Sequence, residues 1–234
     1  MKNINDIINY LANKEIIIMC GHYGSGKTNL SVNFAIKLKE QTGFGCTLAD
    51  LDMVNPYFRS ADNEEDLKKH GVNLIIPPFA NTSLDVSAIP PEIYSVFVKK
   101  SEPRHAIIDV GGDGNGALVL GMFADKIKQT DYEMIYVVNK YRNLTKDAEA
   151  AVNLAKHIEH VSTLKITSLI NNSNIGGLTT GKEVMDSVSY AQNISDLLNI
   201  PMLGTSYMTD IDVDFSGEML YNMFKIKNYT KKLW

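Results

Sequence analysis

The sequence is poor in cysteine. Only two of its 234 residues are cysteines, Cys20 and Cys46, and they do not form a C-x-x-C pair. Zinc or iron–sulfur ligation by clustered thiolates therefore has no support. Because both cysteines sit in apolar, strand-like runs, we expect buried free thiols, which suits a reducing cytosol.

The chain also lacks long apolar runs and an excess of basic residues. No run approaches the ~18 residues that span a bilayer, and residues 1–14 lack the uninterrupted apolar core of a signal peptide. The formal net charge is −4, so non-specific nucleic-acid binding through a basic field is not indicated. With 44% apolar and 21% charged residues, the composition predicts a soluble, cytoplasmic globular protein.

Short apolar runs alternate with helical patterns along the chain. Helical patterns cover residues 4–12, 27–41, 147–160 and 184–198, and strands are predicted at 15–20, 46–49, 72–76, 105–110, 134–138, 165–170 and 202–205. This alternation predicts a three-layer α/β/α fold with a mostly parallel sheet of about seven strands. With no low-complexity linker and no internal repeat, we expect one domain over residues 1–234.

One segment carries the most specific chemistry. Residues 21–28 read G-H-Y-G-S-G-K-T between a predicted strand and a predicted helix, which is the G-x-x-x-x-G-K-[ST] pattern of a phosphate-binding loop. The glycines let successive N–H groups point at one centre, and the helix adds its positive end. Lys27 supplies a charge for the outer phosphates, and Thr28 can place its hydroxyl on Mg²⁺.

Acidic residues end two of the other predicted strands. In parallel sheets, ligands bind outside the carboxyl ends of the strands. There Asp109 can hold Mg²⁺, and Gly112 permits close backbone approach to a γ-phosphate. Asp50 and Asp52 share a face by strand alternation, and one of them could orient the attacking water or a Mg²⁺-bound water.

Two further strand ends bear on the nucleobase. Residues 139–142 read N-K-Y-R, which resembles the N-K-x-D guanine reader. Arg142 stands where that motif has its carboxylate, so a guanine-specific role is disfavoured. The amide of Asn171 can donate and accept as adenine requires, which favours ATP over GTP.

Three other features leave alternatives open. Residues 55–59 expose two aromatics and an arginine, as a switch, a lid, a partner contact or a packed loop would. His157 and His160 are favoured as a solvated helix face over a metal site. Residues 219–234 suggest a basic amphipathic helix, for which packing on its own domain is favoured over membrane contact.

Taken together, these motifs resemble the MinD/ParA-type ATPases (CobQ/CobB/MinD/ParA) of the SIMIBI class of P-loop NTPases. The resemblance implies a Mg²⁺-dependent, slow ATPase that binds ATP and ADP and acts as a nucleotide switch for a protein partner. It implies catalytic roles for Lys27 and Asp52, with Thr28, Asp52 and Asp109 at the metal. The implied nucleotide contacts are Gly21, His22, Tyr23, Gly24, Ser25, Gly26, Lys27, Thr28, Asn29, Gly112 and Asn171.

The sequence departs from this family at one position. The family's loop carries a second, signature lysine that serves a nucleotide-sandwich homodimer, and here the residue is His22. Loss of a fixed positive charge can slow phosphoryl transfer by orders of magnitude. A non-hydrolysing adaptor therefore remains an alternative, and homodimerisation stays open. A small-molecule kinase or ligase is another alternative, because residues 77–91 and the loop at 57–59 could form a substrate pocket. A metallochaperone-type GTPase is the third, because the loops of such proteins also read G-S-G-K-T without the signature lysine.

Overall fold

The computed structural model describes residues 4–52, 63–76, 89, 91–98, 102–112, 114–213 and 222–229. Within these ranges, eight strands form one sheet in the order β3-β2-β4-β1-β5-β6-β7-β8, with parallel pairing throughout. The strands are β1 (Ile16–Cys20), β2 (Gly45–Leu51), β3 (Val72–Ile75), β4 (Arg104–Val110), β5 (Tyr132–Val138), β6 (Ser168–Asn171), β7 (Met202–Met208) and β8 (Met223–Ile226).

The eighth strand corrects the prediction for the C-terminal segment. Its residues were expected in a basic amphipathic helix, but β8 pairs with β7. The Phe224 ring lies 6.0 Å from the Phe34 ring, and of the four residues of β8 only Lys225 is exposed. Because the apolar side chains enter the sheet core, this short run is more stable as a strand.

Helices fill the connections. They are α1 (Ile4–Leu11), α2 (Lys27–Thr42), α3 (Glu64–Lys69), α4 (Gly114–Gly121), α5 (Ala124–Ile127), α6 (Ala148–Ser162), α7 (Gly181–Asp186) and α8 (Val188–Leu198), with short 3₁₀ turns at η2 (Pro91–Phe97), η3 (Asn143–Thr145) and η4 (Gly176–Leu178). The single helix predicted over 184–198 is divided at Ser187. The Ser187 hydroxyl donates to the Val184 carbonyl and accepts from Asn171, which explains the break there.

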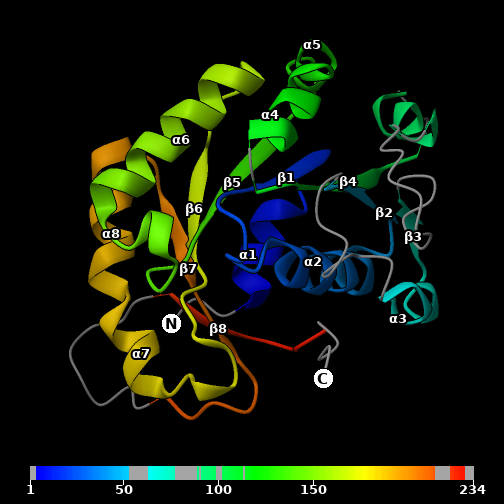
Figure 1. The fold of residues 1–234 in the computed structure, drawn as a ribbon. Coiled ribbons are helices and arrows are strands. Elements are labelled where there is room, and N and C mark those ends of the chain that lie inside the picture. The colour runs from blue at the N-terminus through cyan, green and yellow to red at the C-terminus, as the bar shows by residue number, and fades with distance from the viewer. Residues whose placement is uncertain are drawn as a thin grey trace, which may run out of the picture.

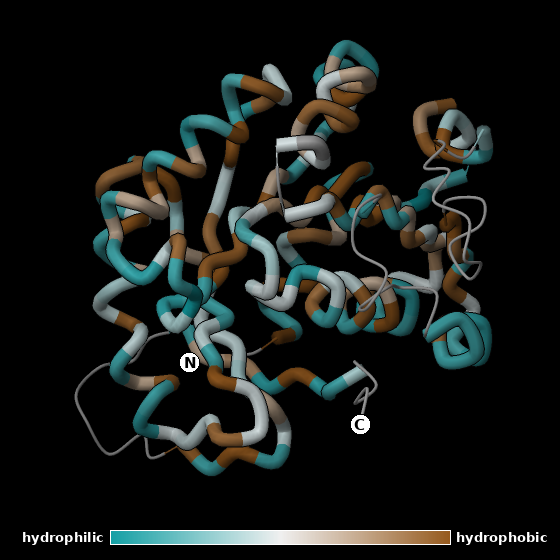
Figure 2. Tube along the Cα trace, viewed as in Figure 1, coloured by the Kyte–Doolittle hydropathy of each residue, from teal (hydrophilic) through white to brown (hydrophobic). Residues whose placement is uncertain are grey.

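The layers confirm the predicted fold class. Figure 1 shows α4, α6 and α8 on one side of the sheet and α1, α2 and α3 on the other. Figure 2 shows apolar segments along the central strands and alternating hydropathy along the helices. Every residue of β1 is buried, as expected for a strand covered on both faces.

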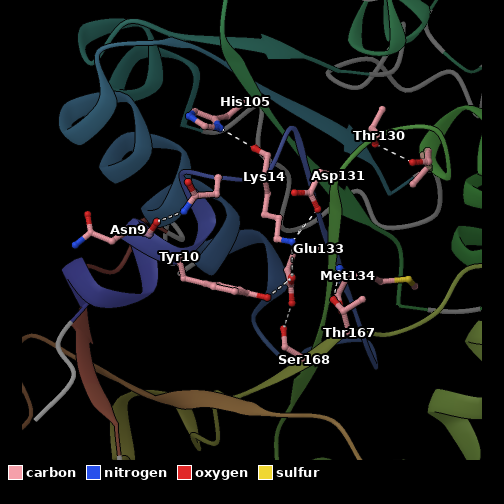
Figure 3. Close-up of polar contacts among 12 residues, drawn as sticks. Asn9, Tyr10, Lys14, His105, Thr130, Asp131, Glu133, Met134, Thr167 and Ser168 are labelled. Atoms are coloured by element: carbon pink, nitrogen blue, oxygen red, sulfur yellow. Dashed lines mark hydrogen bonds and ion pairs between the residues drawn. The ribbon is translucent and has the colours of Figure 1, made fainter.

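The N-terminal helix is fixed to the amino end of the sheet by a buried carboxylate. Glu133, 1% exposed, accepts hydrogen bonds from the Tyr10 hydroxyl at 2.7 Å and from the Ser168 hydroxyl at 2.6 Å (Figure 3). The Lys14 ammonium bonds Asp131 at 2.8 Å and lies 4.0 Å from Glu133. This cluster lies at the amino ends of the strands, whereas the predicted site lies at their carboxyl ends.

Both cysteines are free and buried, as expected from the sequence. Burial raises the pKa of the Cys20 and Cys46 thiols to about 12. Of the helices in the described ranges, none combines the length and apolar character needed to cross a membrane.

Candidate functional site

The glycine loop lies where β1 ends and α2 begins. Strand β1 is bordered by β4 and β5, so the ends of these strands lie beside the loop. Gly26 is the N-cap of α2 with a left-handed φ of 87°, and no side chain caps the helix. The N–H groups in the first turn of α2 therefore remain available for an anion.

The lysine of the motif is held within the loop. Lys27 is 6% exposed, and its ammonium donates to the His22 carbonyl at 3.1 Å. The backbone N–H of Ser25 donates to the same carbonyl at 3.2 Å. The loop thus closes on itself beside one buried positive charge at the start of α2.

Strand β4, which borders β1, and the next strand, β2, both carry a buried carboxylate near their ends. Asp109 on β4 is the register partner of Asp50 on β2 and of Met19 on β1. Ile107, two residues before Asp109, packs in the apolar core on the α2 side of the sheet. Because side chains two apart share a face of a strand, Asp109 also lies on the α2 side.

The Asp109 carboxylate is poorly compensated in the folded protein. It is 1% exposed, and neither oxygen has a hydrogen-bond partner of normal geometry among the described residues. Burial raises the pKa of Asp109 most, and repulsion from Asp50 raises it further. The Lys27 ammonium and the Thr28 hydroxyl lower this pKa, but by less.

These groups fit Mg²⁺. The cation takes oxygen ligands, commonly one or two carboxylates with waters and substrate phosphates completing an octahedron. Asp109 offers two buried oxygens, and Thr28 offers a hydroxyl close enough to lower the pKa of Asp109. In the described parts of the chain, no group of three or more His, Cys, Asp or Glu side chains is placed to hold a metal ion. His157 and His160 therefore have no third ligand of these types among the described residues.

Asp52 stands at the rim of this acidic pair. It follows the end of β2, is partly exposed, and its backbone N–H donates to Asp50 Oδ1 at 2.9 Å. Its assignment to water positioning stays a prediction. The aromatic loop at 55–59 lies outside the described residues, and so do residues 77–88 of the 77–91 stretch that was considered for a substrate pocket.

Gly112 lies directly against the glycine loop. A Cβ at this position would sit 2.3 Å from the Tyr23 backbone nitrogen and 2.8 Å from the His22 carbonyl carbon. Only a glycine permits this approach. The segment after β4 is thus in contact with the loop backbone. A movement of one of them would displace the other.

The predicted base-contact residue is occupied within the protein. Asn171 is fully buried, and its Nδ2 donates to Ser187 Oγ at 2.8 Å and Thr205 Oγ1 at 3.2 Å. Its Oδ1 accepts from both the N–H and the hydroxyl of Ser173. All four hydrogen-bonding positions of the amide are used, so a base contact would have to displace one of these bonds.

Asn29 also directs its side chain away from the predicted ligand. Its Nδ2 donates to the Lys227 carbonyl at 3.0 Å, and its Oδ1 accepts from the Tyr229 N–H at 2.7 Å. The side-chain amide therefore binds the segment after β8. The backbone N–H, in the first turn of α2, is the group left for a phosphate contact.

Two contacts to the loop were missed in the sequence. Asn172 donates to the Ser25 carbonyl at 2.7 Å, and Arg142 Nε donates to the Gly24 carbonyl at 2.8 Å. Asn172 stands beside Asn171 at a strand end, and Arg142 takes the fourth place of the N-K-Y-R motif. Those positions were the available signal, but Arg142 was interpreted only with respect to the base and Asn172 was given no role.

Comparison with known proteins finds similarity at the level of structure alone. No family model matches the sequence, and no curated protein matches it. The solved structures that resemble the chain include FtsY from Mycoplasma mycoides, with a TM-score of 0.51, 16% identity, and coverage of 86% of this chain and 69% of that chain. Cell division protein ftsY from Thermotoga maritima has a TM-score of 0.50 at 15% identity, covering 90% of this chain and 71% of that chain.

A third similar structure is a nucleotide complex. Signal Recognition Particle 54 kDa protein from Aeropyrum pernix K1 in complex with GDP gives a TM-score of 0.51 at 15% identity, covering 86% of this chain but 47% of that chain. The chain thus spans about half to seven tenths of the length of these three structures. The similarities show that the chain has the α/β fold of the P-loop NTPases.

Proposed function

We propose that this chain is a Mg²⁺-dependent, ATP-binding P-loop protein that acts in the cytoplasm as a slow nucleotide switch of the MinD/ParA type. Residues 1–234 would serve as one nucleotide-binding domain. The observation that carries the proposal is the pairing of Lys27 and Thr28, at an uncapped helix start, with the buried carboxylate of Asp109. That arrangement suits a phosphate chain with its cation.

Each side chain has a distinct role in this proposal. Lys27 neutralises the outer phosphates, and the N–H groups of the loop orient them. Thr28 and Asp109 hold Mg²⁺, which would neutralise phosphate charge during transfer. Asp52 orients water for a slow ATPase reaction, and Asp109 and Gly112 couple the γ-phosphate to the segment that follows them.

The base preference is the finer part of the proposal. The missing carboxylate at Arg142 favours ATP, whereas one of the similar structures holds GDP. GTP is therefore the competing ligand. Competition between ATP and GTP for one labelled nucleotide would decide between them.

Titration calorimetry with ATP and Mg²⁺ tests the binding site. Lys27→Ala should weaken binding at least tenfold, because a buried cation facing the phosphates is lost. Lys37→Ala is the matched control, since this lysine lies on the outer side of α2 and pairs with Glu40 at 2.8 Å. Equal ATP affinity in Lys27→Ala and wild type would refute the assignment.

A non-hydrolysing adaptor is the second candidate, and position 22 favours it. His22 Nδ1 lies 2.6 Å from the Tyr23 carbonyl, so the imidazole is engaged locally where the family has its lysine. Single-turnover measurements separate the two functions. Phosphate release that Asp52→Ala abolishes supports the switch, and no release with or without a protein partner or homodimer supports the adaptor.

A further inference from the structure

Two consecutive carbonyls of the glycine loop are held from outside by side chains of distant segments. Arg142 Nε donates to the Gly24 carbonyl at 2.8 Å, and Asn172 Nδ2 donates to the Ser25 carbonyl at 2.7 Å. The partners are 118 and 147 residues apart in the sequence. They come from the segments that follow β5 and β6, which are consecutive strands of the sheet.

These bonds fix which way the loop's N–H groups point. In a planar trans peptide, the carbonyl and the following N–H point in opposite directions. Holding the carbonyls of Gly24 and Ser25 outward therefore turns the N–H groups of Ser25 and Gly26 inward. The Ser25 N–H indeed donates to the His22 carbonyl, which also accepts from the Lys27 ammonium.

The two side chains touch the loop closely. A Cβ on Gly26 would lie 2.1 Å from Asn172 Nδ2, and one on Gly24 would lie 3.1 Å from Arg142 Cζ. Both glycines have a left-handed φ, of 87° and 73°. The backbone shape and the contact thus require glycine at the same two positions.

Both side chains are held in turn. Asn172 is 3% exposed, and its Oδ1 accepts from the Ser206 hydroxyl of β7 at 2.6 Å, which directs Nδ2 toward the loop. Arg142 is fixed at its backbone: its N–H donates to the Asn139 carbonyl and its carbonyl accepts from the Thr145 N–H. A connected polar network of this kind keeps a rigid geometry.

The neighbouring amides face the protein in the same way. Asn171 uses all four of its hydrogen-bonding positions internally, as described above. Asn139 donates to the Asn174 carbonyl and accepts from the N–H groups of Tyr141 and Asn174. In the described part of the chain, the asparagines at these strand ends shape backbone segments around the site.

We propose that Asn172 and Arg142 are positioning residues that hold the loop in its phosphate-binding shape, and that they set affinity for the phosphate chain independently of the base. The inference rests on the proposed nucleotide binding and names the part of the ligand that these residues govern. A role in reading the base would instead make their effect depend on the nucleotide.

The test compares ATP, GTP and inorganic tripolyphosphate, each with Mg²⁺, by titration calorimetry. Arg142→Ala and Asn172→Ala should each weaken all three ligands by a similar factor, about five- to tenfold. Asn172→Asp keeps the shape but sets an acceptor against the Ser25 carbonyl, so it should bind more weakly than Asn172→Ala. Lys146→Ala, an exposed cation beside η3, is the control for net charge.

The outcomes are distinguishable. Loss of ATP or GTP affinity with tripolyphosphate unchanged overturns the inference in favour of a base contact. Wild-type affinity in both alanine variants overturns it as well and leaves nucleotide binding intact. If wild type binds none of the three ligands, the proposed function fails first. Urea unfolding of each variant shows whether a loss of affinity results from loss of the folded state. Because Arg142 is exposed, Arg142→Ala should stay folded.

Discussion

Asp50 and Asp109 are register partners on the adjacent strands β2 and β4, and both are 1% exposed. Asp50 accepts a hydrogen bond from the Asp52 N–H, whereas Asp109 has no partner of normal geometry among the described residues. Two like charges in one buried place oppose folding, and the Lys27 ammonium offsets this only in part. Stability is thus lowered at the place where a metal would be bound.

Replacement of Asp109 by asparagine should stabilise the protein in the absence of ligand. The uncharged amide removes the desolvation cost and the repulsion from Asp50, so we expect a gain of about 1–3 kcal/mol in the free energy of unfolding at pH 8. Urea denaturation measures this gain. Asp125→Asn, on the exposed side of α5, is the control and should change stability little. A less stable Asp109→Asn protein would contradict the account.

The same carboxyl group predicts a pH dependence. Its pKa is raised by burial and Asp50 from 3.8 to about 7, so the folded state holds the proton more tightly than the unfolded state. The free energy of unfolding should therefore fall as pH rises from about 4 to 7. Urea midpoints across this range should show a smaller decline in Asp109→Asn than in wild type.

The contact between Gly112 and Tyr23 predicts a second variant. A methyl group at position 112 would meet the loop backbone, so Gly112→Ala should cost about 2–3 kcal/mol of stability and weaken ATP binding by displacing the loop. Gly177→Ala is the matched control, because nothing lies within 4 Å of its added Cβ. Equal stability of the two variants would show that the contact is not maintained in solution.

The parts predicted correctly from the sequence are local in the chain. The run before Gly21 and the glycine spacing define β1, the loop and the start of α2 within about a dozen neighbouring residues, so their chemistry is visible in one segment. The hydrogen bond from Asn172 to Ser25 joins residues 147 positions apart, so no local sequence pattern predicts it. The prediction for residues 223–226 was wrong for another reason. Four residues with one lysine are compatible with a helix or a strand, and the contact of Phe224 with Phe34 favours the strand.

The buried Glu133 carboxylate, at the amino end of β5 and away from the candidate site, should affect stability alone. Tyr10→Phe removes the hydroxyl that donates to Glu133 at 2.7 Å, with an expected cost of about 1–2 kcal/mol and unchanged ATP affinity. Tyr94→Phe, at an exposed ring stacked edge-on against Phe123, is the control. A loss of ATP affinity in Tyr10→Phe would contradict the separation of the Glu133 cluster from the candidate site.

The same tyrosine predicts an alkaline limit. Burial and the Glu133 carboxylate raise the pKa of Tyr10 above its usual value of 10.0, so the folded state retains the phenolic proton more tightly. Stability should then fall as pH rises above about 10. Urea midpoints between pH 9 and 11 should decline less in Tyr10→Phe than in wild type.

The segment after β8 is paired to α2 by two asparagine side chains one helical turn apart. Asn33 donates to the Lys227 carbonyl and accepts from the Lys227 N–H, both at 2.9 Å, while Asn29 bonds Lys227 and Tyr229. The two side-chain amides thus provide backbone hydrogen-bond partners for residues 227–229, as a neighbouring strand would. Asn33→Ala should increase hydrogen exchange at the Lys227 N–H about tenfold or more, whereas Asn193→Ala, at an exposed position of α8, should not. Unchanged exchange would show that pairing of β8 alone orders this segment. Faster exchange would show that the segment is held by α2, the helix that begins with Lys27.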